Sequence, residues 1–245
     1  MFVSSQEKNR EEKYYLLKPI NMSENTRILE LLKTKSSTKQ EVFRNTKSVF
    51  QKLTSILEDK ANSLNSQMSE EDKFVELSFE SKGDFESHIT FSGDRLIFHM
   101  HSNVFDFPPS HSIHKTSYVK EDKLRSFCGV IHVYNFLNDS FKYNRLNDVG
   151  NLVARVFVNK ENHFFVEGEQ QLGFLFNDFI NQELNNETLE LIVDSSMIFT
   201  LNFDLITPNF KDINLVNVHQ LLDMNINNKL KTSKSLGFKF SFENK

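Results

Sequence analysis

The sequence predicts an α+β fold, with N-terminal helices packed on a mostly antiparallel, meander-type sheet and further helices near the C-terminal third. Apolar residues recur with the helical period before Ser66 and with a period of two from Val75 onward. The predicted strands follow one another as hairpins instead of alternating with helices, which is typical of antiparallel sheets. We therefore expect residues 1–68 to form a helical segment of the same domain as an antiparallel sheet with helices over residues 69–245.

The composition is that of a folded globular protein, because 38% of the 245 residues are hydrophobic and 25% are charged. Cys128 is the only cysteine, so no disulfide can form within the chain, and we expect a buried thiol and a cytoplasmic location. The first 20 residues are strongly charged and lack the apolar core of a signal peptide. No apolar run approaches the ~18–20 residues of a membrane span, so we expect no membrane contact.

The N-terminal quarter is predicted to hold three helices. Residues 4–18 are polar and compatible with a helix, which Pro19 ends. Ser23 can cap a second helix, whose pattern is interrupted at Ser36 and Ser37. Its apolar face would carry Ile28, Leu31 and Leu32.

The third predicted helix spans about 25 residues and has the most regular apolar pattern in the chain. Thr38 and Glu41 have the spacing of a capping box at its start. The helix can dock its apolar stripe on the sheet that follows, or residues 38–64 can associate with a protein partner or a second copy in a coiled-coil-like seam. The stripe consists of Val42, Phe43, Val49, Phe50, Leu53, Ile56, Leu57 and Leu64.

The rest of the chain is predicted to be mainly strands. A two-residue turn at Gly93 and Asp94 joins the second strand to the third, and residues 110–123 are expected to form a loop. Helical patterns begin at Glu169 and at Asn186. The predicted strands are, in order, residues 75–80, 85–91, 95–107, 130–137, 141–146, 151–158, 163–166, 200–206 and 236–242.

Histidines gather on the predicted hairpin. Counting outward from its turn places His88 opposite His99, and Glu86 opposite His101. Cross-strand Cβ atoms lie about 4.5–5.5 Å apart, so the four side chains would form one patch on the face opposite the apolar residues. Three imidazoles and a carboxylate are a ligand set for Zn²⁺ or Fe²⁺. The patch can instead be an ordinary set of solvent-facing polar side chains, and then no cofactor is expected.

Positive charge is concentrated near the N-terminus. Residues 1–60 hold 12 Lys or Arg and 8 Asp or Glu, although the net charge of the whole chain is −4. A basic helical surface could contact nucleic-acid phosphates, while the acidic remainder of the chain disfavours that interpretation. The candidate residues are Lys33, Lys35, Lys39, Arg44, Lys47 and Lys52.

No motif in the sequence names a reaction. The chain has no G-x-S-x-G, no glycine-rich phosphate loop and no C-x-x-C. We therefore hypothesise a non-catalytic binding or interaction protein that can form homo-oligomers. One alternative is a metal-dependent enzyme that activates water at the patch of Glu86, His88, His99 and His101. Another is a nucleic-acid binder that uses the basic N-terminal helices.

Overall fold

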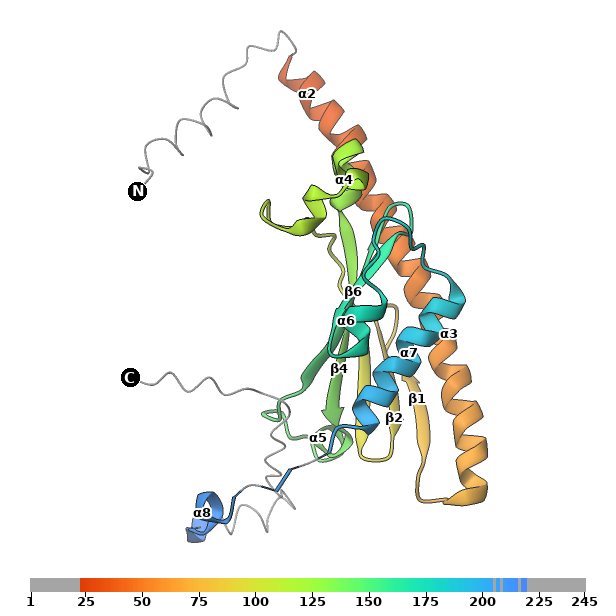
Figure 1. The fold of residues 1–245 in the computed structure, drawn as a ribbon, viewed down its shortest axis with the longest axis vertical. Helices are drawn as coiled ribbons and strands as arrows, with labels where there is room; N and C mark the ends of the chain where they lie inside the picture. Colours follow the sequence, from red (N-terminus) through yellow and green to blue (C-terminus); the bar gives the residue numbers. More distant parts are fainter. Residues whose placement is uncertain (1–22, 205, 208, 216, 220–245) are drawn as a thin grey trace. The chain divides into compact units, whose positions relative to one another are not determined.

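The computed structural model describes residues 23–204, 206–207, 209–215 and 217–219 (Figure 1). Contacts between Cα atoms divide the chain into two units, Met1–Ser37 and Thr38–Lys245. The helix predicted for residues 4–18 and the strand predicted for residues 236–242 lie outside the described residues. In the described ranges, no helix is both long and apolar enough to cross a membrane.

The first unit contains the helix α2 (Glu24–Leu31), which begins where the sequence predicts. The Ser23 hydroxyl caps this helix and accepts a hydrogen bond from the backbone N–H of Thr26 at 3.3 Å. The predicted interruption at the two serines is wrong, because the chain continues through a π-helical turn, η1 (Leu32–Ser36). The Ser37 hydroxyl donates a hydrogen bond to the Leu32 carbonyl, so it supports the helical path instead of ending it.

The helix α3 (Ser37–Glu71) has 35 residues and is longer than predicted, because it starts directly after η1 without a capping box. From Thr38 onward its apolar stripe packs against the sheet, which confirms the docking interpretation. The buried part of the stripe is therefore covered by the chain's own sheet, and association of residues 38–64 with a partner or a second copy stays a prediction. The buried residues of α3 include Val42, Val49, Phe50, Leu53, Leu57 and Ala61.

Six strands form one antiparallel sheet in the order of the chain, which confirms the predicted meander. Each strand pairs with its neighbours in sequence, so successive hairpins build the whole sheet. The outer edge of the last strand is closed by the chain that follows, where the Val166 N–H donates to the Phe176 carbonyl at 2.8 Å. The strands are β1 (Leu77–Ser81), β2 (Glu86–Phe91), β3 (Asp94–Met100), β4 (Cys128–Leu137), β5 (Asn151–Asn159) and β6 (Phe164–Gly168).

The helices α3 and α7 (Asn186–Leu201) cover the same face of the sheet (Figure 1). Their apolar residues and alternate strand residues form the main core, and the hydroxyl oxygens of Thr54 on α3 and Ser87 on β2 lie 2.9 Å apart inside it. Since one face of each strand is fully engaged by helices, the alternating residues must face the opposite side. The largest core side chains include Phe50, Leu53, Ile89, Phe98, Ile131, Leu189 and Ile192.

The segment between β3 and β4 covers one end of the opposite face, and the predicted loop there is wrong. It contains the 3-10 helices η2 (Ser112–Lys115) and η3 (Lys123–Ser126) around the short helix α4 (Ser117–Glu121). The cause is a second apolar cluster. Burial of apolar residues in this cluster stabilises short helices, although the segment has no helical periodicity in its sequence. The cluster contains Ile113, Tyr118, Val119, Cys128, Val130, Phe157, Phe165 and Phe179.

Two predicted strands are wrong. Residues 141–146 do not return along the sheet, because the chain forms the helix α5 (Asn138–Lys142) after β4. Asp148 closes this connection by accepting hydrogen bonds from the Ser140 hydroxyl at 2.7 Å and pairing with Arg145 at 2.8 Å. The strand predicted for residues 200–206 is replaced at its start by α7, whose buried Thr200 keeps the helical period.

Other elements differ in extent. The third strand ends at Met100, and only an isolated bridge between Phe105 and Cys128 continues towards residue 107. The helix predicted from Glu169 is limited to α6 (Gln171–Leu175), and α7 begins with Asn185, not Asn186, as its cap. A four-residue helix, α8 (Phe210–Ile213), follows.

Gly129 allows the close approach of β4 to α3. A Cβ atom at this position would lie 2.2 Å from Oγ1 of the buried Thr46. We predict that Gly129→Ala lowers the free energy of unfolding by about 1–3 kcal/mol, as overpacking does in other cores. Urea denaturation would measure the change. Gly93→Ala is the control, because a Cβ atom there meets nothing within 4 Å. Equal stability of the two variants would contradict the packing of α3 on β4.

Candidate functional site

The face of the sheet opposite α3 and α7, called the second face from here on, is covered at both ends and open between them. At one end it carries the apolar cluster of Val130, Phe157 and Phe165. At the other end Phe141 of α5 packs against Phe136, with the ring centroids 5.5 Å apart. The candidate site is the strip between these two apolar regions.

Ionisable side chains cross this strip on five adjacent strands. The strand register makes each one the Cα partner of the next, so they form a continuous line across the sheet. None of these side chains is fully buried in the described structure, and each is between exposed and buried. We call this line the polar row; it consists of Glu86, His99, His132, Arg155 and Glu167.

Three imidazoles meet at the centre of the strip. The ring of His132 lies 6.5 Å from the ring of His99 and 6.5 Å from the ring of His101, measured between centroids. On its other side the His132 ring stacks on Tyr134 at 5.6 Å with an interplanar angle of 13°. Phe105 packs edge-on against His101 at 4.7 Å. We call His99, His101 and His132 the histidine trio.

The surroundings of His132 disfavour its protonated form. Burial lowers the pKa of His132 most, and the neighbouring His99, Arg155 and His101 lower it further. Its Nδ1 atom is buried and has no hydrogen-bond partner in the described structure. A negatively charged group placed beside His132 would therefore stabilise the protonated form of its ring.

The carboxylates at the two ends of the polar row are already engaged. Glu86 accepts a hydrogen bond from His88 Nε2 at 2.8 Å, and Glu167 pairs with Arg155 and lies 4.0 Å from His111. In the described part of the chain, no acidic side chain lies within ion-pair distance of the histidine trio.

The predicted pairing of the histidine hairpin is wrong. The turn consists of Ser92 and Gly93, so Glu86 is opposite His99 and His88 is opposite Ile97. The partners are therefore displaced by two residues along β3, which leaves every side chain on its predicted face but removes the predicted pairs of His88 with His99 and of Glu86 with His101. His88 is 3% exposed and lies under Phe141 instead of joining the histidine trio.

The structure brings His99 and His101 together and adds His132, which sequence reasoning missed. In the described residues, no three His, Cys, Asp or Glu side chains are placed to hold a metal ion. The metal hypothesis for Glu86, His88, His99 and His101 stays a prediction that nothing here supports. The missed signal was the alternation of His132, Tyr134 and Phe136 in the predicted strand 130–137, which puts them on one face.

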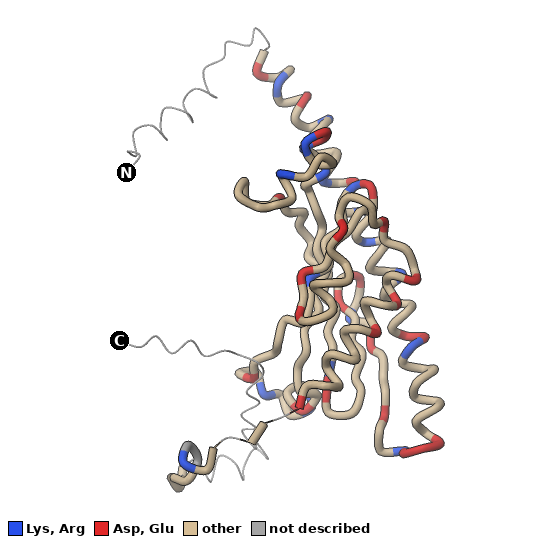
Figure 2. The backbone as a smooth tube through the Cα atoms, in the orientation of Figure 1, with Lys and Arg blue, Asp and Glu red and all other residues tan. Residues whose placement is uncertain are grey.

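The basic nucleic-acid candidates are divided between the two units of the chain. Lys33 and Lys35 lie in η1, and the other four lie on α3 among acidic residues (Figure 2). Lys47 bonds to Asp84 at 2.6 Å, and the Lys39 ammonium lies 5.2 Å from the ring of Phe127. Arg44 and Lys52 are exposed. Phosphate binding by these residues stays a prediction.

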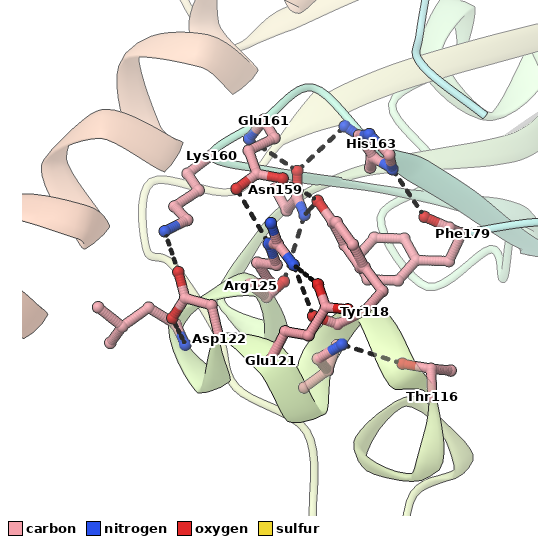
Figure 3. A network of polar contacts seen from close by, with 12 residues as sticks. Thr116, Tyr118, Glu121, Asp122, Arg125, Asn159, Lys160, Glu161, His163 and Phe179 are labelled. Carbon is pink, nitrogen blue, oxygen red and sulfur yellow. Dashed lines mark hydrogen bonds and ion pairs between the residues drawn. The ribbon is translucent and has the colours of Figure 1, made fainter. Parts of the chain in front are cut away.

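A network of polar contacts beside the second face fixes the segment that covers its end (Figure 3). Tyr118 donates its hydroxyl to Glu161 at 2.7 Å and accepts from Asn159 at 2.9 Å. Its ring lies between the Arg125 guanidinium and the His163 ring, which stacks on it at 4.7 Å. Burial raises the pKa of the Tyr118 hydroxyl. Because every polar atom described here has a partner, this network is structural support for the site.

The thiol of Cys128 is not available for chemistry. Its side chain is fully buried, and burial raises the pKa of the thiol. A neutral, covered thiol is neither a nucleophile nor a metal ligand.

Comparison with known proteins gives no matching family model, no matching curated protein and no matching solved structure. The function must therefore be argued from the geometry of this chain.

Two histidines of the second face, His88 and His132, predict acid sensitivity. Burial lowers the pKa of both His88 and His132 below the ordinary value of 6.5, so the unfolded chain binds protons more readily than the folded one. The stability they allow is present at neutral pH and is lost as the pH falls below about 6.5. We predict that the free energy of unfolding decreases from pH 7.5 to 5.5, and that His88→Gln combined with His132→Gln reduces this decrease. Urea titrations at both pH values test it, and an unchanged decrease in the double variant would contradict it.

Proposed function

We propose that this chain is a non-catalytic binding protein and that the second face of its sheet receives the partner. The observation that carries the proposal is the polar row, which lies half-exposed between two apolar regions. A surface that mixes partly buried aromatic rings with a few polar groups resembles the centre and rim of protein interfaces. The proposal includes a cytoplasmic location, in keeping with a single cysteine, Cys128, which cannot form a disulfide within the chain.

A sheet face meant only for the interior would be apolar along its whole length. On one side the neighbouring row is apolar on β4, β5 and β6, with Val130, Phe157 and Phe165. On the other side the neighbouring row contains His88, Ile97 and Tyr134. Placing five ionisable groups between them has a desolvation cost, which a binding partner can offset with complementary groups. The polar row therefore favours the binding of a partner at this face over a role of the face in the protein core.

The charge of the strip indicates the kind of partner. Glu86 and Glu167 are engaged by His88 and Arg155, whereas the histidine trio has no acidic partner in the described structure. A carboxylate from a partner protein would complete it, because an imidazole N–H donates a hydrogen bond to a carboxylate oxygen. We infer an acidic protein surface as the partner.

The proposed interface replaces the one predicted on the long helix. The apolar stripe of α3 is covered by the sheet, so its exposed side offers mainly polar residues such as Gln51 and Lys52. Homo-oligomers remain part of the proposal only through the second face.

The test compares two charge reversals in affinity capture from cell extract followed by binding titration of the captured protein. We predict that His99→Glu with His101→Glu weakens the partner's binding by about 30-fold or more, as the loss of a central contact does. The control, Gln51→Glu with Lys52→Glu on α3, should bind like the wild type.

Two results would contradict the proposal. One is a partner whose binding is lost in the α3 variant and kept in the second-face variant, which would place the binding site on the basic helix. If that partner is a nucleic acid, its affinity should also fall steeply as the salt concentration rises. The other is the recovery of no partner together with sedimentation as a monomer.

A further inference from the structure

The helix α7 is apolar on both of its sides. Its inner side belongs to the core, where residues such as Leu189 and Ile192 are buried. Leu191 and Ile198 are seven residues apart on the outer side, and they are 56% and 57% exposed. Leu201, one turn further along, is 58% exposed. A helix that is apolar all round is normally buried all round, so the outer side of α7 is expected to be covered.

The exposed apolar groups of α7 continue onto α6. Leu175 of α6 is half-exposed, and it lines the same cavity as Leu191 of α7. We call Leu175, Leu191, Ile198 and Leu201 the α7 surface. Exposed apolar side chains that lie together on a folded domain mark a site of contact with another segment or molecule.

The part of the chain that carries the α7 surface is acidic. Residues 161–209 contain nine Asp or Glu and no Lys or Arg. Glu187 and Glu190 are exposed on α7 and form no ion pair with the described residues, whereas Asp194 pairs with Lys60 of α3 at 2.6 Å. The α7 surface therefore combines apolar side chains with uncompensated negative charge, which favours an occupant that is both apolar and basic.

The charge of the α7 surface disfavours the same surface of a second copy as the occupant. Most oligomers of one chain are symmetric dimers, in which a patch meets the identical patch of the other copy. Glu187 and Glu190 of one copy would then lie close to those of the other. Like charges that face each other across an interface disfavour association.

The C-terminal part of the chain has the complementary composition. Residues 220–245 lie outside the described residues, and their sequence contains five Lys, two acidic residues and nine apolar residues. The lysines are Lys229, Lys231, Lys234, Lys239 and Lys245, and the apolar residues are Leu221, Leu222, Met224, Ile226, Leu230, Leu236, Phe238, Phe240 and Phe242. This segment therefore offers both the charge and the apolar side chains that the α7 surface favours.

The C-terminal segment is long enough to reach the α7 surface. Residues 202–219 join it to the end of α7. The 26 residues from 220 to 245 can extend over about 90 Å, whereas a helix of 16 residues is about 24 Å long. Because the segment is tethered to the same chain, its effective concentration at α7 is high and modest contacts are sufficient for binding.

We propose that residues 220–245 bind to the α7 surface of their own chain. Their apolar side chains cover Leu191, Ile198 and Leu201, and their lysines lie beside Glu187 and Glu190. The α7 surface is on the helical side of the sheet, away from the second face, so this proposal does not depend on the proposed function.

Photo-crosslinking in the full chain tests the proposal. Benzoylphenylalanine replaces Ile198 in one variant and the exposed Gln40 of α3 in the control. Gel electrophoresis separates crosslinks within a monomer from those between copies, and mass spectrometry of the digest identifies the residues that are joined. We expect position 198 to crosslink within the monomer to residues 220–245, with a yield at least about fivefold above that of position 40, because only bound segments stay close to the probe.

Matched charge reversals test the contribution of the lysines. Glu187→Lys with Glu190→Lys should lower the yield of the crosslink from position 198 by about threefold or more, because the lysines of the segment would then meet like charges. The control is Glu70→Lys with Glu71→Lys at the exposed end of α3, which changes the net charge equally and should leave the yield unchanged.

Four results would overturn the proposal. Position 198 crosslinks to a second copy, or it crosslinks to no part of residues 220–245. Alternatively, position 40 crosslinks to this segment as well as position 198 does, or the reversals on α7 and on α3 have the same effect on the yield.

Discussion

The packing of α3 on one face of the sheet is the constraint on which the rest of the structure depends. Six strands in a simple meander would expose two faces, and neither could be stable alone. The buried residues of α3, together with those of α7, close one face completely. Each fully buried apolar side chain contributes roughly 1.5–3 kcal/mol, so this contact is a large part of the folding free energy. Because this contact covers one face of the sheet, only sheet residues on the other face can contact a binding partner.

The alternation of side chains along each strand determines which residues lie on the second face. Because Ile89, Phe98 and Ile131 point at the helices, His88, His99 and His132 must point the other way. The segment of residues 105–127 and α5 then cover the two ends of that face and leave its middle open. The packing of the core and the alternation of the strands therefore fix the position of the polar row, without any further helix or strand.

Much of the fold could be predicted because its signals are local. The spacing of Val42, Val49 and Phe50 indicated the long helix, and alternation around Phe79 and Ile89 indicated the first strands. The failures lie where distant contacts override local pattern. Residues 141–146 alternate like a strand but are held in a tight connection by Asp148, and the loop before β4 became helical over a cluster formed with Phe157 and Phe165.

The candidate site was predicted only in part, for a reason of register. The faces of His99 and His101 follow from alternation, but the partners of these residues depend on which two residues make the turn. Ser92 takes the left-handed conformation at φ 53°, so the turn starts one residue earlier than the glycine suggested. His132 joined the site through the pairing of β3 with β4 across a connection of 27 residues, from 101 to 127, whose geometry no local signal reveals.

The packing of α3 on the sheet is tested most directly by two double-cysteine variants that join positions on α3 and β2. The hydroxyl oxygens of Thr54 and Ser87 lie 2.9 Å apart, so cysteines at these positions are within reach of a disulfide. We expect Thr54→Cys with Ser87→Cys to form this bond within the monomer under mild oxidation, and Thr54→Cys with His88→Cys not to form it. Formation of the bond to position 88 instead, or its absence in both variants, would show that α3 does not cover the face assigned to it.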